Sequence, residues 1–241
     1  MKQLISTIFH RHEGRYGYRR IQAELKWMYG LTVNHKKVLR LMRELGLSCQ
    51  IRRKKYKSYK GRVGKEAPHI IKRSFQADQP NEKWATDITE FRLFQKKFYL
   101  SPVLDMYNGE IISYSISHSP NKQLVDDMLT PAFQRLPENH HVILHSDQGW
   151  QYRTPHYRRQ LSEQGITQSM SRKGNCFDNA VIENFFGILK SEFLYYKNFQ
   201  DKNHFLKELK QYIDYYNHHR VKSRLGMSPV YYRLQHHTTV A

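Results

Sequence analysis

The stretch KFYLSPVLDMYNGEIISYSIS, residues 97–117, decides the kind of fold this chain adopts. Its two halves, 97–107 and 110–117, are rich in aromatic and β-branched residues, which is typical of β-strands. The Asn108-Gly109 pair between them is the strongest short-range signal for a β-hairpin. The sequence therefore predicts two neighbouring antiparallel strands here.

Further strands and helices are predicted on both sides of this hairpin. On the N-terminal side, WATDITEFRL at 84–93 alternates as one strand with Asp87 in its middle. On the C-terminal side the predicted elements are a helix at 121–134, a strand at 142–147, a helix at 155–164, a strand at 166–170 and a helix at 178–196. This order predicts an α/β fold, a mixed sheet with helices packed on it. Two last helices are expected at 202–218 and from Ser228-Pro229 onward.

The composition is that of a globular protein with a real core, since 39% of the 241 residues are hydrophobic. No apolar run approaches the ~18 residues of a membrane helix, and the N-terminus lacks the features of a secretory signal. We therefore expect a cytoplasmic protein without a membrane segment. Cys49 and Cys176 fit neither a disulfide framework nor a zinc cluster, and small buried residues are favoured over a catalytic thiol.

Charge is distributed unevenly along the chain. Lys and Arg number 40 and Asp and Glu 21, a net charge of +19. Residues 1–75 hold 20 basic and 4 acidic residues, whereas residues 76–241 hold 20 and 17. A strongly basic end joined to a nearly neutral remainder indicates a nucleic-acid-binding part attached to a part with another task. A surface charged only for solubility, the alternative, does not require so uneven a distribution.

Residues 1–50 predict a helix-turn-helix region. Apolar residues recur at helical spacing in three segments, which stop at Gly14, Gly30 and Gly46. The third segment follows Asn34, a favoured N-cap. The outer face of that helix carries Lys36, Lys37, Arg40 and Arg43. Such a face would meet DNA phosphates, while a helical bundle with a charged exterior is the alternative from the pattern alone.

Residues 51–75 predict a basic linker. The run RRKKYKSYKGRVGK, 52–65, has eight Lys or Arg in fourteen positions and no apolar period. We expect it to follow a phosphate backbone, and Tyr56 and Tyr59 could stack on bases. A solvated tail is the alternative. The cations at its start are Arg52, Arg53, Lys54 and Lys55.

Two aspartates lie at unusual places in the predicted sheet. A lone carboxylate such as Asp87 is costly to bury inside a strand. Asp147 ends the predicted strand at 142–147, and the two side chains would meet if their strands were neighbours. Carboxylate oxygens are the ligands that Mg²⁺ prefers, so the pair is a candidate metal site. Acids that cap or form salt bridges are the alternative.

The helix predicted at 178–196 carries two further acids that must be told apart. At ~100° per residue, Glu183 shares a face with Asn179 and Lys190, while Asp178 lies on the opposite side. Asp178 also stands where the helix begins, and Asp is among the best N-caps. We therefore predict a structural role for Asp178 and a functional role for Glu183.

Three motifs carry a family resemblance: WATDITEF, HSDQGWQY and SRKGNCFDNAVIENFFGILKSE. They resemble the acidic triad of DDE transposases in the retroviral-integrase-like superfamily. The 35 residues between Asp147 and Glu183 match the spacing of that family, and Lys190 matches its basic residue. The chain is most similar to the second-reading-frame transposase of bacterial insertion-sequence-three-type elements. The similarity extends through GRYGYRRI (14–21), VNHKKVLRLMRELGL (33–47), YIDYYNHHR (212–220) and GMSPVYYR (226–233).

The resemblance implies an RNase H-like catalytic core at 76–196 and a C-terminal helical extension at 197–241. Asp87, Asp147 and Glu183 would bind two Mg²⁺ ions, for which Mn²⁺ would be a substitute. The implied activity is cleavage at element DNA ends, followed by strand transfer into target DNA. Two residues would face the DNA end: Asn179 and Lys190. Four would shape the loop around Asp147: His145, Ser146, Gln148 and Gly149.

The resemblance also implies partners. They are double-stranded DNA, further copies of the chain on that DNA, and an upstream-frame product as fusion or partner. The expected location is the bacterial cytoplasm, at the nucleoid. A DNA-binding protein with an inactive or regulatory nuclease-like domain is one alternative, which the intact triad disfavours. A nuclease of RNase H or Holliday-junction type is another, which the basic helical region and the C-terminal motifs disfavour.

Overall fold

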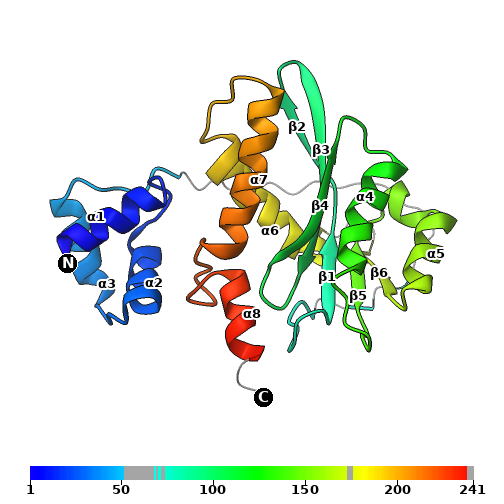
Figure 1. The fold of residues 1–241 in the computed structure, drawn as a ribbon, viewed down its shortest axis with the longest axis horizontal. Coiled ribbons are helices and arrows are strands. Elements are labelled where there is room, and N and C mark those ends of the chain that lie inside the picture. Colours follow the sequence, from blue (N-terminus) through cyan, green and yellow to red (C-terminus); the bar gives the residue numbers. More distant parts are fainter. Residues whose placement is uncertain (52–67, 69, 72–73, 173–175, 238–241) are drawn as a thin grey trace. The chain divides into compact units, whose positions relative to one another are not determined.

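The structure is a computed structural model that describes residues 1–51, 68, 70–71, 74–172 and 176–237. The chain divides into two compact units, one made of Met1–Lys55 with Ile188–Ala241 and the other of Tyr56–Gly187. Figure 1 shows their helices and strands. The predicted basic arm lies outside the described residues, and with it Arg52, Arg53, Lys54 and Lys55.

The unit Tyr56–Gly187 is built on a six-stranded mixed sheet, which confirms the predicted fold class. Its strands are β1 (Lys83–Thr86), β2 (Thr89–Leu93), β3 (Lys96–Asp105), β4 (Ile111–Ser117), β5 (Ile143–Ser146) and β6 (Thr167–Met170). The order is β2-β3-β1-β5-β6, with β4 also paired to β3. Strand β3 is antiparallel to β1, β2 and β4, whereas β5 is parallel to both β1 and β6.

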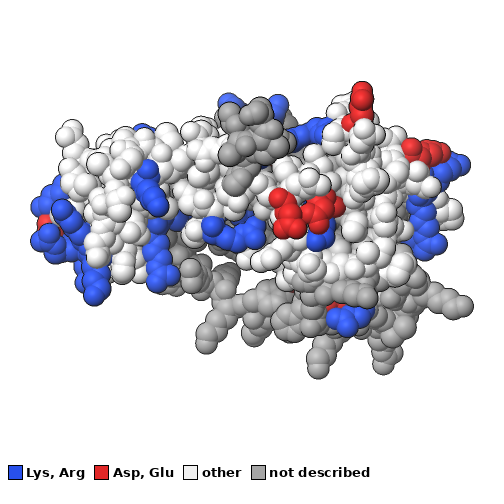
Figure 2. All heavy atoms as spheres, turned by 90° about the horizontal axis from the view of Figure 1, so that it is seen from below, with Lys and Arg blue, Asp and Glu red and all other residues white. Residues whose placement is uncertain are grey.

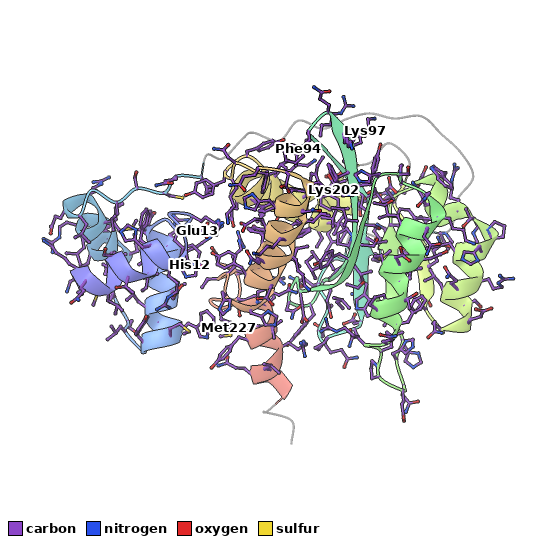
Figure 3. The ribbon with its side chains drawn as sticks, turned by 45° about the horizontal axis from the view of Figure 1, so that its top comes forward. His12, Glu13, Phe94, Lys97, Lys202 and Met227 are labelled. Atoms are coloured by element: carbon purple, nitrogen blue, oxygen red, sulfur yellow. The ribbon has the colours of Figure 1, made fainter. Side chains whose placement is uncertain are left out.

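The hairpin predicted around Asn108-Gly109 is confirmed as β3 and β4. Gly109 takes a positive φ of 76°, and the Asn108 side chain accepts a hydrogen bond from Glu110 N at 3.0 Å. A second hairpin joins β2 and β3 through Phe94 and Gln95, whose φ values are also positive. Figure 3 shows Phe94 at the tip of this second hairpin.

The prediction of one strand at 84–93 is wrong in one respect that matters for Asp87. Strand β1 ends at Thr86 and β2 begins at Thr89, although both keep a single register with β3 across the break. In that register Pro102 lies opposite Asp87, and a proline has no N–H to donate to the ladder. Asp87 therefore follows the end of β1 instead of lying in the middle of a strand.

Three helices cover this sheet: α4 (Lys122–Phe133), α5 (Pro155–Glu163) and α6 (Ala180–Leu189). In Figure 1, α4 and α5 lie on one side of the sheet and α6 on the other. Asn121 and Thr154 cap α4 and α5 by accepting backbone N–H groups of the first turn. Trp84 of β1, Leu144 of β5 and Met128 of α4 are among the fully buried residues of one core cluster. No helix in the described part of the chain is long and apolar enough to cross a bilayer.

The other unit begins with the three predicted helices, α1 (Lys2–Arg11), α2 (Tyr18–Tyr29) and α3 (His35–Glu44). Asn34 caps α3 as predicted, accepting Lys36 N at 2.8 Å. Gly30 ends α2 in the left-handed conformation, which glycine adopts without strain. The buried core of these helices includes Ile5, Ile8, Ile21, Leu25 and Val38.

The C-terminal helices belong to this same unit. They are the π-helical turn Lys190–Leu194, α7 (Lys202–His218) and α8 (Pro229–His237). Val221 is part of the buried core of the N-terminal helices, and its N–H donates to the Tyr16 hydroxyl at 2.6 Å. The last 54 residues therefore pack with the first 55 within one compact unit.

Candidate active site

The sheet brings Asp87 and Asp147 together. Strands β1 and β5 are parallel neighbours in which Ala85 pairs with His145. Two residues further along this register, Asp87 lies opposite Asp147, each directly after the last residue of its strand. Neighbouring strands run about 4.8 Å apart, so both carboxylates stand at the same edge of the sheet. Strands β1 and β5 are therefore the neighbours that a meeting of Asp87 and Asp147 requires.

The loop after β5 is shaped around the Asp147 carboxylate. Gly149 N donates to Asp147 Oδ1 at 2.8 Å. Burial raises the pKa of Asp147, while the Gly149 N–H and the Arg153 guanidinium act in the opposite direction. A Cβ on Gly149 would lie 3.0 Å from Asp147 Oδ1 and 3.2 Å from the Tyr152 ring. A side chain at this position would therefore force the carboxylate or the Tyr152 ring to shift by a few tenths of an ångström.

The Asp87 carboxylate is held from two sides. Its Oδ1 accepts Ile88 N at 2.7 Å, and its Oδ2 accepts Asn179 Nδ2 at 3.1 Å. Asn179 lies in the 3₁₀ turn Cys176–Asn179 that leads into α6. Its Oδ1 is buried and has no hydrogen-bond partner among the described residues. The start of α6 is thus anchored at Asp87, beside a buried oxygen acceptor.

Glu183 lies one helical turn after Asn179 and is half-buried. A spacing of four residues puts both side chains on the same face of the helix, the face that meets Asp87. Among the described residues no three His, Cys, Asp or Glu side chains lie close enough together to hold a metal ion as they stand. The structure therefore joins the two aspartates and places Glu183 on the adjoining helix face.

Asp178 is fully buried. Its carboxylate accepts Arg172 N at 3.1 Å, Arg172 Nε at 3.0 Å and Arg172 Nη2 at 3.2 Å. Helix α6 begins at Ala180, two residues later than predicted. Lys190 opens the π-helical turn and belongs to the other unit.

Sequence reasoning missed two tyrosines near the carboxylates. Burial raises the pKa of Tyr152 well above its usual range, and the charges of Asp87 and Asp147 raise it further. Burial and Asp147 likewise raise the pKa of Tyr157, whose ring lies 5.4 Å from that of Tyr152. In the sequence an aromatic residue after a strand is indistinguishable from ordinary core. Unlike these buried tyrosines, the Trp150 side chain, three residues after Asp147, is 52% exposed.

Helix α3 presents its predicted cations to solvent. Val38, Leu41 and Met42 are buried, while the four cations Lys36, Lys37, Arg40 and Arg43 are exposed. Arg40 forms a surface ion pair with Glu44 at 3.3 Å. Figure 2 shows one face of the N-terminal helices, where blue Lys and Arg side chains gather with little red. This surface suits a polyanion.

Comparison with known proteins agrees with the fold. Residues 1–55 match an HTH-like domain family, and residues 77–176 and 183–236 match integrase core domain families. The structure of the HTLV-2 integrase catalytic core domain in complex with magnesium, in its trimeric form, resembles this fold with a TM-score of 0.51. The two are 16% identical, and the match covers 65% of this chain and 98% of that one. The protein thus joins an HTH-like domain to an integrase-type catalytic core.

Two curated relatives from Escherichia coli (strain K12) narrow the class. The InsK protein for insertion sequence element IS150 is 50% identical over 236 residues, which are 98% of this chain and 83% of the relative. Transposase InsF for insertion sequence IS3A is 34% identical over 229 residues, covering 94% and 79%. The chain belongs to the IS3 family of insertion-sequence transposases, with an integrase-type catalytic core for DNA transposition.

Proposed function

We propose that this transposase cuts DNA at element ends and transfers the freed strand into target DNA, with Asp87, Asp147 and Glu183 as its metal-binding carboxylates. One observation carries the proposal. The register of β1 and β5 sets Asp87 opposite Asp147, and Asn179 ties the helix of Glu183 to Asp87. This arrangement supports a shared site for three acids that are distant in sequence.

The oxygen atoms offered by these residues are of the type that Mg²⁺ prefers. Carboxylate oxygens are its preferred protein ligands, and the buried Asn179 Oδ1 adds an acceptor that has no partner among the described residues. We propose two Mg²⁺ ions at this site, with Mn²⁺ as a substitute. When bound, the ions would stabilise the charge on the attacking and leaving oxygens of an in-line displacement. Three carboxylates suit this task because together they balance much of the charge of two divalent cations.

The chain's own residues position the reacting groups. Gly149 N–H orients the Asp147 carboxylate, and the Asn179 amide orients that of Asp87. In the first step a water oxygen attacks the phosphorus at the element end, and the broken P–O bond frees a 3′-OH. In the second step this 3′-OH attacks a target phosphodiester, whose 3′ oxygen leaves. Neither step requires a protein nucleophile.

The experiment that tests this function uses the full-length protein, labelled double-stranded element-end DNA and Mg²⁺. Strand-joined products are expected from the wild-type protein, and Asp87→Asn should abolish them because an amide is a poor Mg²⁺ ligand. Hydrolysis without joining would instead favour a nuclease. DNA binding without cleavage, unchanged by Asp87→Asn, would favour a regulatory protein and overturn the assignment of the carboxylates.

The HTH-like unit would hold the DNA through α3, and two element ends require more than one copy of the chain on the DNA. An upstream-frame product remains a candidate fusion or partner. Asn179 and Lys190 would contact the cleaved end. The cations of α3 are proposed to contact phosphates because all four are exposed on a helix whose other face is buried.

Replacing Lys36 and Lys37 together with Ala should weaken DNA binding about tenfold or more at about 0.1 M salt. The slope of log K against log salt should become shallower by about 2, one for each lost phosphate contact. Fluorescence anisotropy across a salt series measures both. The matched control, Lys207→Ala with Lys210→Ala, removes the same charge from exposed positions of α7. Equal slopes for the two double variants would contradict docking through α3.

A further inference from the structure

His145 is a fully buried histidine inside β5, two residues before Asp147. Its Nδ1 lies 2.9 Å from Ser169 Oγ on β6. Its Nε2 lies 2.8 Å from the backbone carbonyl oxygen of Asp178 and 3.2 Å from Ser171 Oγ. One ring therefore connects three segments at the edge of the sheet that carries the aspartate pair.

The hydrogen bonds define the form of the ring. Ser169 Oγ accepts Ile70 N at 3.1 Å and Ile71 N at 3.4 Å, which occupies both of its lone pairs. Its own O–H is then free to donate to His145 Nδ1. A carbonyl oxygen can only accept, so His145 Nε2 carries the proton and donates it to Asp178. The Nε2–H of the ring is thus directed at the turn before α6.

The turn before α6 links the region of Asp147 to the helix that carries Glu183. The carbonyl of Asp178 is bound by His145, and its carboxylate is bound by Arg172. The next residue, Asn179, contacts Asp87, and Glu183 follows one helical turn later. The strand that precedes Asp147 is thus hydrogen-bonded directly to the turn from which the helix of Glu183 starts.

We propose that His145 is a positioning residue, whose Nε2–H sets the place of Glu183 relative to Asp147 by holding the carbonyl of Asp178. The inference rests on the proposed function, in which these acids bind the same ions. Groups that orient the ligands of a metal site commonly change metal affinity or activity 10–100-fold when they are lost. An apolar residue here would pack equally well but would remove the hydrogen bond from position 145 to this carbonyl.

Two substitutions test the roles of the two ring nitrogens of His145 separately. In His145→Gln the side-chain amide reaches the position of Nε2 and can donate to Asp178. In His145→Asn the amide reaches only the position of Nδ1, so the bond to Asp178 is lost while the bond to Ser169 can remain. Both variants are made in the full-length protein and compared with wild type by two measurements, neither of which uses DNA.

The first measurement is backbone hydrogen exchange in the metal-free protein. His145→Asn should speed exchange of the amides at 179–183 at least about tenfold, because the start of α6 loses one of its anchoring hydrogen bonds. His145→Gln should leave these rates within about threefold of wild type. The amides of α4 are the internal reference and should not change in either variant. Equal acceleration in α4 and α6 would show general destabilisation and overturn the proposal.

The second measurement is the affinity for Mn²⁺, determined by calorimetric titration. His145→Asn should weaken it roughly 10–100-fold, whereas His145→Gln should stay within about threefold of wild type. Equal losses in the two variants, or no loss in either, would overturn the proposal. If His145→Asn does not fold, His145→Gln decides the test. A folded His145→Gln protein with weakened Mn²⁺ binding overturns the proposal, whereas wild-type Mn²⁺ binding and exchange rates in that variant support it. A failure of the proposed function would appear separately, as wild-type protein that does not join DNA.

Discussion

Asp147→Asn should lower the rate of strand joining at least about a thousandfold and should also make the protein more stable. The loss corresponds to about 4 kcal/mol of transition-state stabilisation, which is typical when an essential catalytic group is removed. The gain in stability has a separate cause. Burial raises the pKa of Asp147, so its negative charge is held at a cost in the folded state at neutral pH.

Asparagine removes that charge without changing the shape of the side chain. Its amide oxygen still accepts Gly149 N, which donates to Asp147 Oδ1 at 2.8 Å. It also removes a charge that disfavours ionisation of Tyr152 and Tyr157 but leaves their packing intact. The free energy of unfolding should rise by roughly 0.5–2 kcal/mol, the usual gain when a functional constraint is relieved.

Joining of labelled element-end DNA and thermal unfolding of the metal-free protein measure the two effects. Asp127→Asn is the matched control, because it makes the same substitution at an exposed position of α4 in the same unit. It should change neither quantity. Joining by Asp147→Asn within tenfold of the wild-type rate would remove Asp147 from the catalytic site.

The elements of the fold are predictable because their signals are local. The Asn108-Gly109 turn, the Asn34 cap and the Gly30 stop each act within a few residues, and the structure has all three. The break after Thr86 is not local. It depends on Pro102, which lies opposite only once β1 has paired with β3.

The candidate site also combines features that are visible in the local sequence with features that depend on the fold. The spacing of the acids indicated which residues to consider, but their meeting depends on β5 being the parallel neighbour of β1. Which strand lies beside β1 depends on the pairing of all the strands in the sheet. The hydrogen bond from Asn179 to Asp87 likewise spans 92 residues, so no local pattern shows it. The anchoring of α6 and the burial of Tyr152 become visible only in the folded chain.

The joining of Met1–Lys55 with Ile188–Ala241 in one compact unit is a further non-local feature, and Glu192 contributes to it. Glu192 is almost fully buried. Its carboxylate accepts Arg220 Nε at 2.7 Å, Arg220 Nη2 at 2.8 Å, Arg20 Nη1 at 2.9 Å and the Tyr212 hydroxyl at 3.2 Å. These partners come from α2, from α7 and from the segment after it. One carboxylate thus connects the two ends of the chain.

Glu192→Gln should lower the free energy of unfolding of this unit by about 3 kcal/mol at neutral pH. Glutamine keeps the shape but leaves two guanidinium groups facing a neutral amide, and Arg220 is itself buried. Breaking a buried ion pair by removing one partner typically costs about 3–5 kcal/mol, because the remaining charge stays desolvated. Urea unfolding followed by far-UV circular dichroism measures the change. Glu44→Gln is the control, since its partners Lys2 and Arg40 are on the surface and the substitution should have little effect.

The pH dependence of stability gives an independent measure of the same interaction. Burial alone would raise the pKa of Glu192, but Arg220 and Arg20 outweigh it and lower the pKa to about 2. A carboxylate whose pKa is depressed in the folded state stabilises the protein above its unfolded pKa of about 4.3. That contribution, about 3 kcal/mol at 1.36 kcal/mol per pKa unit, is lost as the pH falls from about 4.5 to 2. Glu192→Gln has no such group to titrate, so the difference in unfolding free energy between variant and wild type should shrink across this window. A difference that stays constant from pH 7 to pH 2 would show that the ion pairs of Glu192 do not stabilise the unit.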